Sequence, residues 1–241
     1  MKINRLNFSV ILIILSVQIS HTQTISLGIK TGLSCSTPYS YTIIGENKYP
    51  IYDFKKETRF SLLPGVYANL PLKNSFYFQT EVSLVDKGIT VRGIMKEKLI
   101  NYFYYLHFPQ MLQYHFLENK KKSLNIYVEA GPYFSRALYT GVKSFDSQGD
   151  LTDNIKNESA FELHRKIDIG AGIGAGTEIK TDIGNFLINL RYEHSILNLI
   201  YNNLPTLVID PVTGIEALST SYKYNRIFLL TIGYHFSIIK L

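Results

Sequence analysis

The sequence predicts an all-β fold, an eight-stranded antiparallel transmembrane β-barrel with up-and-down meander topology, after a cleaved signal peptide. Three observations support this prediction. Apolar residues alternate with small or polar residues along about eight segments. Short and long connections alternate between the segments, and aromatic residues gather near segment ends. A period of two is typical of strands, and segments of roughly 10 residues can cross a bilayer at a tilt.

The clearest alternation runs from Ile167 to Ile179, with the sequence IDIGAGIGAGTEI. One side of this segment carries isoleucine and alanine, and the other carries glycine, Asp168 and Glu178. Successive side chains of a strand point to opposite faces, so we expect the apolar side to meet lipid and the other side to face a barrel interior.

The same stretch also satisfies a dinucleotide-binding fingerprint through Gly170, Gly172 and Ala175, with Glu193 about 20 residues on as the candidate ribose ligand. That fingerprint requires a turn into a helix after the second glycine. Here the alternation continues to Ile179, so nucleotide binding is not expected.

The N-terminal segment predicts export. Lys2 and Arg5 precede the apolar run from Val10 to Val17, and a polar stretch follows, which is the pattern of a signal peptide cleaved before Gln23. The apolar run is too short to span a bilayer as a helix. We therefore predict a signal peptide over residues 1–22 and a barrel domain over residues 23–241.

The charge argues against a nucleic-acid partner. Cleavage removes two of the 25 basic residues and leaves 23 against 19 acidic ones, so the formal charge falls from +6 to +4. The remaining charges are scattered rather than clustered on one face. The short run from Lys120 to Lys122 is interpreted as a solvated turn.

The single cysteine, Cys35, excludes an internal disulfide. The residues before it loosely resemble a lipoprotein cleavage site, but Cys35 lies far beyond the apolar run and inside the first predicted strand. We expect a small apolar thiol and no lipid modification.

Each predicted strand has one apolar side and one small or polar side. In the first strand Lys30 lies on the polar side, and in the third Phe76 and Val82 oppose Glu81. In the fifth strand aliphatic residues alternate with residues that include Glu129. Neighbours joined by short turns are predicted hairpins. The predicted strands are residues 24–36, 58–70, 76–86, 99–116, 124–140, 167–179, 186–199 and 222–238.

The connections indicate an orientation. Polar loops are predicted over residues 37–57, 87–98, 141–164 and 200–221, whereas the turns between them are short. Outer-membrane barrels have short periplasmic turns and longer extracellular loops, so both termini are predicted to be periplasmic. Aromatic residues are predicted to form an outer girdle of Phe60, Tyr102, Tyr104, Tyr201, Tyr222 and Tyr224, and an inner one of Phe76, Tyr114, Phe116, Phe186, Tyr234 and Phe236.

These segments resemble the porin-like, PorT-type outer-membrane β-barrel family. The resemblance covers nearly every predicted strand and leaves out the loops. It implies an eight-stranded barrel in the outer membrane of a diderm bacterium, with no single activity and no catalytic motif. Members often end at an aromatic residue, whereas this chain continues past Phe236 to Leu241. The resembling segments are SLGIKTGLS (26–34), PGVYANLPLKNSFYFQTEVSLVDKG (64–88), YLHFPQMLQYHF (105–116), NIYVEAGPYFSRAL (125–138), residues 167–179, LRYEHSILNL (190–199) and RIFLLTIGYHF (226–236).

No catalytic or metal constellation stands out. His107 and His115 share an inward face but are eight residues apart, too far for one metal without other ligands. His194 and Ser195 are neighbours, so in a strand they point to opposite faces, and no nucleophile motif surrounds them. We expect no enzyme activity and no cofactor.

Charged residues on the inward faces predict a plugged lumen. Folding residues 167–179 against 186–199 sets Gly174 and Gly176 roughly opposite Arg191 and Glu193, so the glycines leave space for the long side chains. An eight-stranded interior is just wide enough for side chains to fill it, and buried charges need partners. The predicted ionic network consists of Lys30, Glu81, Glu129, Asp168, Glu178, Arg191 and Glu193.

Two classes of function follow from this reading. The favoured one is a structural or interaction barrel, monomeric in outer-membrane lipid, with extracellular or periplasmic protein partners or an accessory role in envelope assembly or secretion. The alternative is a small pore or a carrier of apolar ligands across the outer membrane. A soluble lipocalin-like barrel would reverse the faces and point the apolar side inward.

Overall fold

The computed structural model describes residues 24–37, 39–44, 47–50, 55–92, 98–116, 123–156, 165–197, 206–209 and 216–240. The regular elements within these ranges are β-strands. They are β1 (Thr24–Ser36), β2 (Tyr39–Ile44), β3 (Asn47–Pro50), β4 (Lys55–Glu57), β5 (Arg59–Leu62), β6 (Gly65–Pro71), β7 (Phe76–Asp86), β8 (Ile89–Arg92), β9 (Lys98–His115), β10 (Leu124–Phe145), β11 (Leu151–Lys156), β12 (Ile167–Thr181), β13 (Gly184–Ser195), β14 (Thr206–Ile209), β15 (Glu216–Tyr224) and β16 (Arg226–Lys240).

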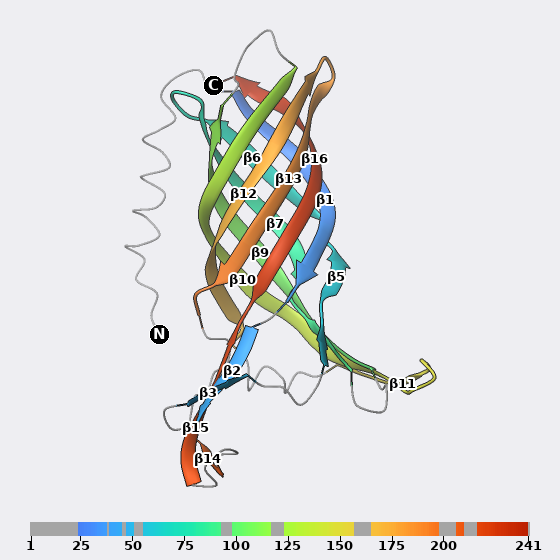
Figure 1. The fold of residues 1–241 in the computed structure, drawn as a ribbon. Coiled ribbons are helices and arrows are strands. Elements are labelled where there is room, and N and C mark those ends of the chain that lie inside the picture. The colour runs from blue at the N-terminus through green and yellow to red at the C-terminus, as the bar shows by residue number, and fades with distance from the viewer. Residues whose placement is uncertain are drawn as a thin grey trace, which may run out of the picture.

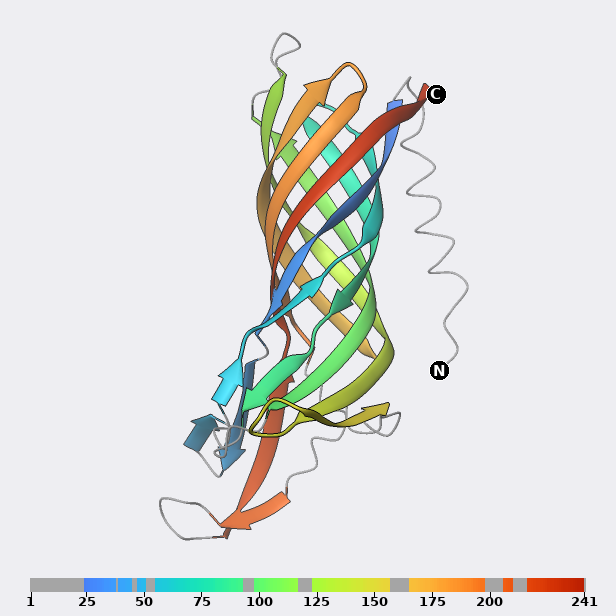
Figure 2. The ribbon, with the colours of Figure 1, turned by 90° about the vertical axis from the view of Figure 1, so that its right-hand side faces the viewer.

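Eight of these strands close into a barrel (Figures 1 and 2). Their order around the ring is β1, β6, β7, β9, β10, β12, β13 and β16, and β16 pairs with β1 to complete it. Every pair is antiparallel, and each strand follows its predecessor in the sequence. The predicted eight-stranded meander is confirmed.

The two faces of the wall have the predicted composition. Outward aliphatic side chains are exposed, as at Ile173, which keeps 63% of its surface. Inward polar side chains are buried, as at Arg191, which keeps 1%. This arrangement is opposite to that of a soluble lipocalin-like barrel, in which the apolar side would point inward.

The two ends of the barrel differ. The short turns, the start of β1 and the end of β16 lie at one end, at the top of Figure 1, which we call the turn end. Asn74 and Ser75 occupy the left-handed region (φ 58° and 62°) in one turn, and Gly184 has φ 147° at another. The projecting strands lie at the opposite end, which we call the loop end.

Two predicted strands are interrupted. The second divides into β5 and β6 at Leu63 and Pro64, because proline has no N–H to donate to the neighbouring strand. The eighth begins at Arg226 rather than Tyr222, and Asn225 separates it from β15. On both sides of the first break the chain pairs with β1. At the second break the partners change, because β15 pairs with β2 and β14 whereas β16 pairs with β1 and β13.

The prediction that residues 37–57, 87–98, 141–164 and 200–221 form loops was wrong, because parts of them form strands. Described parts of these segments form β2, β3, β4, β8, β11, β14 and β15, and β10 runs to Phe145 rather than Thr140. β2, β3, β14 and β15 make a separate four-stranded sheet. β8 and β11 pair with the extensions of β9 and β10, and β4 pairs with β8. Beyond the membrane no contrast between lipid and lumen imposes alternation, yet backbone groups still pair.

The inner girdle is a row of contacting rings near the turn end. The ring centroids of Phe76 and Tyr114 are 5.0 Å apart, those of Tyr114 and Phe116 5.0 Å, and those of Phe186 and Tyr234 5.2 Å. Phe76, Tyr114, Phe116, Phe186 and Phe236 are exposed, as an interfacial girdle requires.

Tyr102 departs from the predicted outer girdle. It keeps only 4% of its surface, because its ring packs across the backbone of Gly141 on the neighbouring strand. A Cβ atom at Gly141 would overlap that ring. Tyr104 is exposed and retains a girdle position.

Several predictions fall outside the described residues. These are the signal peptide over residues 1–22, the Lys120 to Lys122 turn and Tyr201. Within the part of the chain that the structure describes, no helix has the length and apolar character needed to span a membrane.

Candidate functional site in the barrel interior

A row of glycines on β12 forms the floor of the site. Gly170, Gly172, Gly174 and Gly176 face the lumen, and each pairs with one residue of β10 and one of β13. The β10 partners include Tyr133, Glu129 and Tyr127, and the β13 partners include Glu193, Arg191 and Asn189. Long side chains from both neighbouring strands therefore meet above the glycine row.

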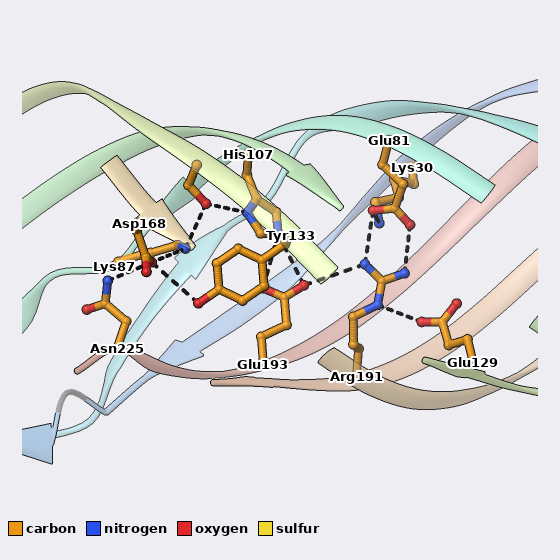
Figure 3. Close-up of polar contacts among 11 residues, drawn as sticks. Lys30, Glu81, Lys87, His107, Glu129, Tyr133, Asp168, Arg191, Glu193 and Asn225 are labelled. Atoms are coloured by element: carbon orange, nitrogen blue, oxygen red, sulfur yellow. Dashed lines mark hydrogen bonds and ion pairs between the residues drawn. The ribbon is translucent and has the colours of Figure 1, made fainter. Parts of the chain in front are cut away.

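Arg191 is the centre of the site (Figure 3). Its guanidinium Nε lies 2.6 Å from Glu129 Oε1, and Nη2 lies 2.7 Å from Glu81 Oε1. Nη1 is 3.6 Å from Glu193 Oε1. All four side chains are almost fully buried, so Arg191 joins carboxylates from β7, β10 and β13 across the lumen.

Other side chains form ion pairs with these carboxylates or donate hydrogen bonds to them. Lys30 on β1 forms an ion pair with Glu81. Gln113 Nε2 donates to Glu129 Oε2 at 3.0 Å, and Asn189 Nδ2 donates to Glu129 Oε1 at 3.0 Å. Buried charges are tolerated when they are paired and hydrogen-bonded, and this cluster meets both conditions.

A second cluster lies nearer the loop end, around Lys87. Its ammonium group is 2.7 Å from Asp168 Oδ2 and 4.4 Å from the ring centroid of Tyr133. Ser195 donates to Asp168 Oδ1 at 2.6 Å, and Asn225 donates to Oδ2 at 3.1 Å. The lysine and the carboxylate are both fully buried.

His107 and Ser135 connect the two clusters. His107 Nε2 lies 3.0 and 3.1 Å from the two carboxylate oxygens of Glu193, and its Nδ1 lies 2.7 Å from Ser135 Oγ. Ser135 Oγ accepts a hydrogen bond from Lys87 Nζ at 2.9 Å. A continuous chain of polar contacts thus runs from Lys87 to Arg191, as Figure 3 shows.

Glu178 forms a third cluster at the turn end. Its carboxylate accepts hydrogen bonds from Asn125 at 3.0 Å and Asn185 at 2.7 Å, and His235 Nε2 lies 3.0 Å from it. Glu178, Asn185 and His235 border a polar pocket of about 190 Å³.

Apolar side chains fill another part of the interior. Leu63, Val85, Ile227 and Leu229 form a contact cluster and keep 1% of their surface or less. They come from the β5–β6 junction, β7 and β16. The lumen is therefore lined partly by charge and partly by aliphatic side chains.

The seven residues of the predicted network are all buried in the interior. Ion pairs join Lys30, Glu81, Glu129, Arg191 and Glu193 directly. Asp168 pairs instead with Lys87, and Glu178 with His235. Gly174 pairs with Arg191 as expected, whereas Glu193 pairs with Gly172 and Gly176 with Asn189.

Sequence reasoning placed Lys87 in a loop and missed its part in the site. The period of two along β7 continues one step beyond Asp86, so Lys87 follows Glu81, Ser83 and Val85 on the inward face. The alternation in the sequence could therefore have placed Lys87 on the inward face. Sequence reasoning also missed the ion pair between Arg59 and Asp86, whose charged atoms lie 2.5 Å apart. The alternation along β7 places Asp86 on the outward register, so it did not indicate this ion pair.

The described residues contain no group of three potential metal ligands close enough to share an ion. Ser195 faces inward and donates to Asp168, whereas His194 lies 3.3 Å from the Tyr192 hydroxyl. Adjacent His194 and Ser195 thus serve different partners. The predictions of no metal, no cofactor and no enzyme activity stay predictions.

Comparison with known proteins places the chain in a family. The model of the outer membrane protein beta-barrel domain family matches residues 17–201, which is more than half of the chain. The chain belongs to this family. It is therefore an outer-membrane β-barrel protein, as the lipid-facing and lumen-facing sides of its strands indicate.

Solved structures support the same fold. OprG from Pseudomonas aeruginosa is 12% identical, with a TM-score of 0.50, and the match covers 90% of this chain and 98% of OprG. OmpW from Escherichia coli is 14% identical with a TM-score of 0.39, over 90% of this chain and 100% of OmpW. Ail from Yersinia pestis is 11% identical with a TM-score of 0.38, over 88% of this chain and 98% of Ail. OprG supports the fold alone, and the other two scores are too low to carry an argument. No curated protein sequence matches the chain.

Proposed function

We propose that this outer-membrane barrel is a structural or interaction protein whose lumen is closed by its own side chains. The observation that carries the proposal is the contact of Arg191 with Glu81, Glu129 and Glu193. One guanidinium on β13 reaches carboxylates on β7 and β10, so it bridges the interior rather than lining one wall.

The physical reason is the width of the barrel. An eight-stranded interior is about as wide as the side chains that fill it. Arg191, Glu81, Glu129 and Lys30 are each more than nine-tenths buried. An open aqueous channel would leave such groups hydrated, so their burial favours a plug.

The projecting strands supply the interaction surface in this proposal. β8, β9, β10 and β11 continue the wall beyond the barrel at the loop end. We infer that this end is extracellular and that both termini are periplasmic, because the short turns all lie at the turn end. We further propose an accessory role in envelope assembly or secretion, with protein partners at either end of a monomeric barrel.

The orientation has its own test. Ser147 is exposed in the turn between β10 and β11, so Ser147→Cys in a Cys35→Ser background presents one thiol at the loop end. We expect a membrane-impermeant maleimide to label this thiol in intact cells. A matched Lys73→Cys variant presents a thiol at the turn end and should be labelled only after the outer membrane is disrupted. The reverse labelling pattern would overturn the orientation.

The rival proposal is a small pore or a carrier of apolar ligands. One observation favours the carrier: an apolar hollow of about 410 Å³ bordered by Ile29, Phe186, Ile188, Ile232 and Gly233. Most of its lining residues occupy outward positions, however, where membrane lipid would enter it.

Efflux from liposomes separates the two proposals. A structural barrel reconstituted with an entrapped small dye should retain the dye, and organic extraction of the purified protein should yield only membrane lipid. Rapid dye efflux would support the pore. Recovery of one non-lipid apolar compound in molar proportion would support the carrier.

A further inference from the structure

The outward face of the barrel carries charge at one end. Its outward positions are otherwise filled mainly by aliphatic and aromatic side chains, but β10 ends its lipid-facing row with exposed Arg136. Arg136 pairs with Leu106 on β9 and Ile167 on β12, at the loop end of the wall. The outward carboxylate nearby, Asp86, is buried and bound by Arg59.

A bulge next to Arg136 changes the direction of the following side chains. The register of β9 and β10 shifts between Ala137 and Tyr139, so Leu138 is an extra residue on β10. Tyr139 then lies opposite Tyr104. Bulges at barrel rims commonly redirect a side chain, and this one adds a tyrosine to the outward face.

Three tyrosines consequently gather beside Arg136. The ring centroids of Tyr102 and Tyr139 are 5.3 Å apart, and those of Tyr104 and Tyr139 are 6.1 Å apart. The hydroxyls of Tyr102 and Tyr139 are 3.2 Å apart. Exposed Leu138 precedes Tyr139 and lies beyond Arg136 toward the loop end.

Basic residues flank the tyrosines on both sides. Lys143, farther along β10, has its ammonium group 6.0 Å from the Tyr102 ring centroid. On the other side, exposed Arg165 lies shortly before β12. Lys166 pairs with inward Ala137 through a hydrogen bond from Ala137 N to the Lys166 carbonyl, so Lys166 takes the inward register. We call Arg136, Lys143, Arg165 and the tyrosines Tyr104 and Tyr139 the rim cluster.

We propose that the rim cluster binds the phosphorylated sugar headgroup of an outer-leaflet glycolipid. The proposal rests on the extracellular orientation of the loop end inferred above. Arginine forms paired hydrogen bonds to phosphate, and basic residues next to a membrane attract anionic headgroups. Tyrosine rings suit the headgroup level, where one side is apolar and the other polar. The aliphatic belt on the turn-end side of Arg136 meets the acyl chains.

Binding of purified lipid A, a bisphosphorylated glycolipid, tests this site. The full barrel in neutral detergent micelles is titrated with lipid A, and Arg136→Gln is compared with Lys73→Gln. Lys73 is an exposed lysine in a turn at the opposite end, so the control removes the same charge elsewhere. Arg136→Gln removes one of the cations that contact the headgroup, so the apparent affinity for lipid A should weaken about fivefold. Lys73→Gln should leave this affinity unchanged. Arg136→Lys should give an intermediate affinity.

Three results would overturn the proposal: no lipid A binding by the wild-type barrel, equal weakening by both glutamine variants, or equal affinity for phosphatidylglycerol.

Cross-linking of the wild-type barrel with photoactivatable lipid A needs no variant to fold. The adducts should map to residues 136–143 or to Arg165, and adducts elsewhere would contradict the site. Micelle binding is independent of orientation, so a failed thiol-labelling result and a failed binding result are distinguishable.

Discussion

Arg191 and Glu129 pair with the same residue, Gly174, from opposite sides of β12, and their side chains form an ion pair of 2.6 Å above it. The glycine has no side chain to separate them. A Cβ atom at Gly174 would lie 2.7 Å from the Leu190 carbonyl oxygen and 2.9 Å from Glu129 Oε1. The alternating glycines of β12 thus make room for the charged centre of the barrel.

Gly174→Ala should therefore destabilise the barrel, by about 1–3 kcal/mol, because its new methyl group meets a backbone oxygen that has little freedom to move. Gly172→Ala is the matched control on the same strand face. There the nearest atoms are side-chain atoms, Met111 Cε at 3.0 Å and Glu193 Cγ at 3.1 Å, which can move more easily than backbone. Urea titrations of refolding in lipid vesicles compare the two variants. If Gly172→Ala costs as much as Gly174→Ala, the proposed close approach over Gly174 is wrong.

Arg191→Met should be among the most damaging interior substitutions. It removes the cation that Glu81, Glu129 and Glu193 share and leaves buried carboxylates with fewer partners. We expect a loss of about 3 kcal/mol or more of unfolding free energy. Arg191→Lys keeps the charge but loses the fork that contacts several carboxylates, so its loss should be smaller. Equal stability of the methionine variant and the wild type would show that these residues merely line a hydrated lumen.

Lys87→Met tests the second cluster. Asp168 would lose its cation but keep hydrogen bonds from Ser195 and Asn225, so we expect a smaller loss than for Arg191→Met. Adding Asp168→Asn should restore part of the lost stability, because the buried charge is then removed as well. A double variant less stable than the wild type by the full sum of the two single losses would indicate that Lys87 and Asp168 act independently.

Depth in the membrane should control the cost of charge on the outward face. Ile173 is exposed to lipid in the middle of β12, so Ile173→Arg should cost about 2–4 kcal/mol. Ser147→Arg adds the same charge in an exposed turn beyond the barrel and should cost almost nothing. Refolding titrations into bilayers measure both, and similar losses would contradict the assignment of the lipid-facing side.

The sequence predicted the strands of the barrel wall more accurately than the segments that continue beyond the barrel. The bounds of β1 and β7 agree with the predicted strands, because lipid on one side and a crowded lumen on the other impose a strict period of two. Beyond the rim both sides meet water, so β11 and β15 lack that signal and were interpreted as loops. Burial of Tyr102 depended on Gly141, a partner 39 positions away that only the β9–β10 register supplies.

The interior was predictable by face but not by partner. Alternation placed Glu81, Asp168 and Arg191 inside, whereas their contacts depend on how far each side chain reaches across the ring. Asp168 on β12 pairs with Lys87, which directly follows β7, and β9 and β10 lie between these two strands in the ring. Such contacts follow from the curvature of the closed barrel, which no single strand encodes.

A planar-bilayer recording of the purified wild-type barrel tests the central claim most directly. If the ion pairs of Arg191 and the aliphatic cluster of Leu63 and Val85 close the lumen, the membrane current should stay at the baseline of a protein-free bilayer. Arg191→Ala in the same bilayer serves as a comparison, since it removes the side chain that crosses the interior. A steady, ohmic conductance of porin size from the wild-type barrel would contradict the account and show that the lumen is open.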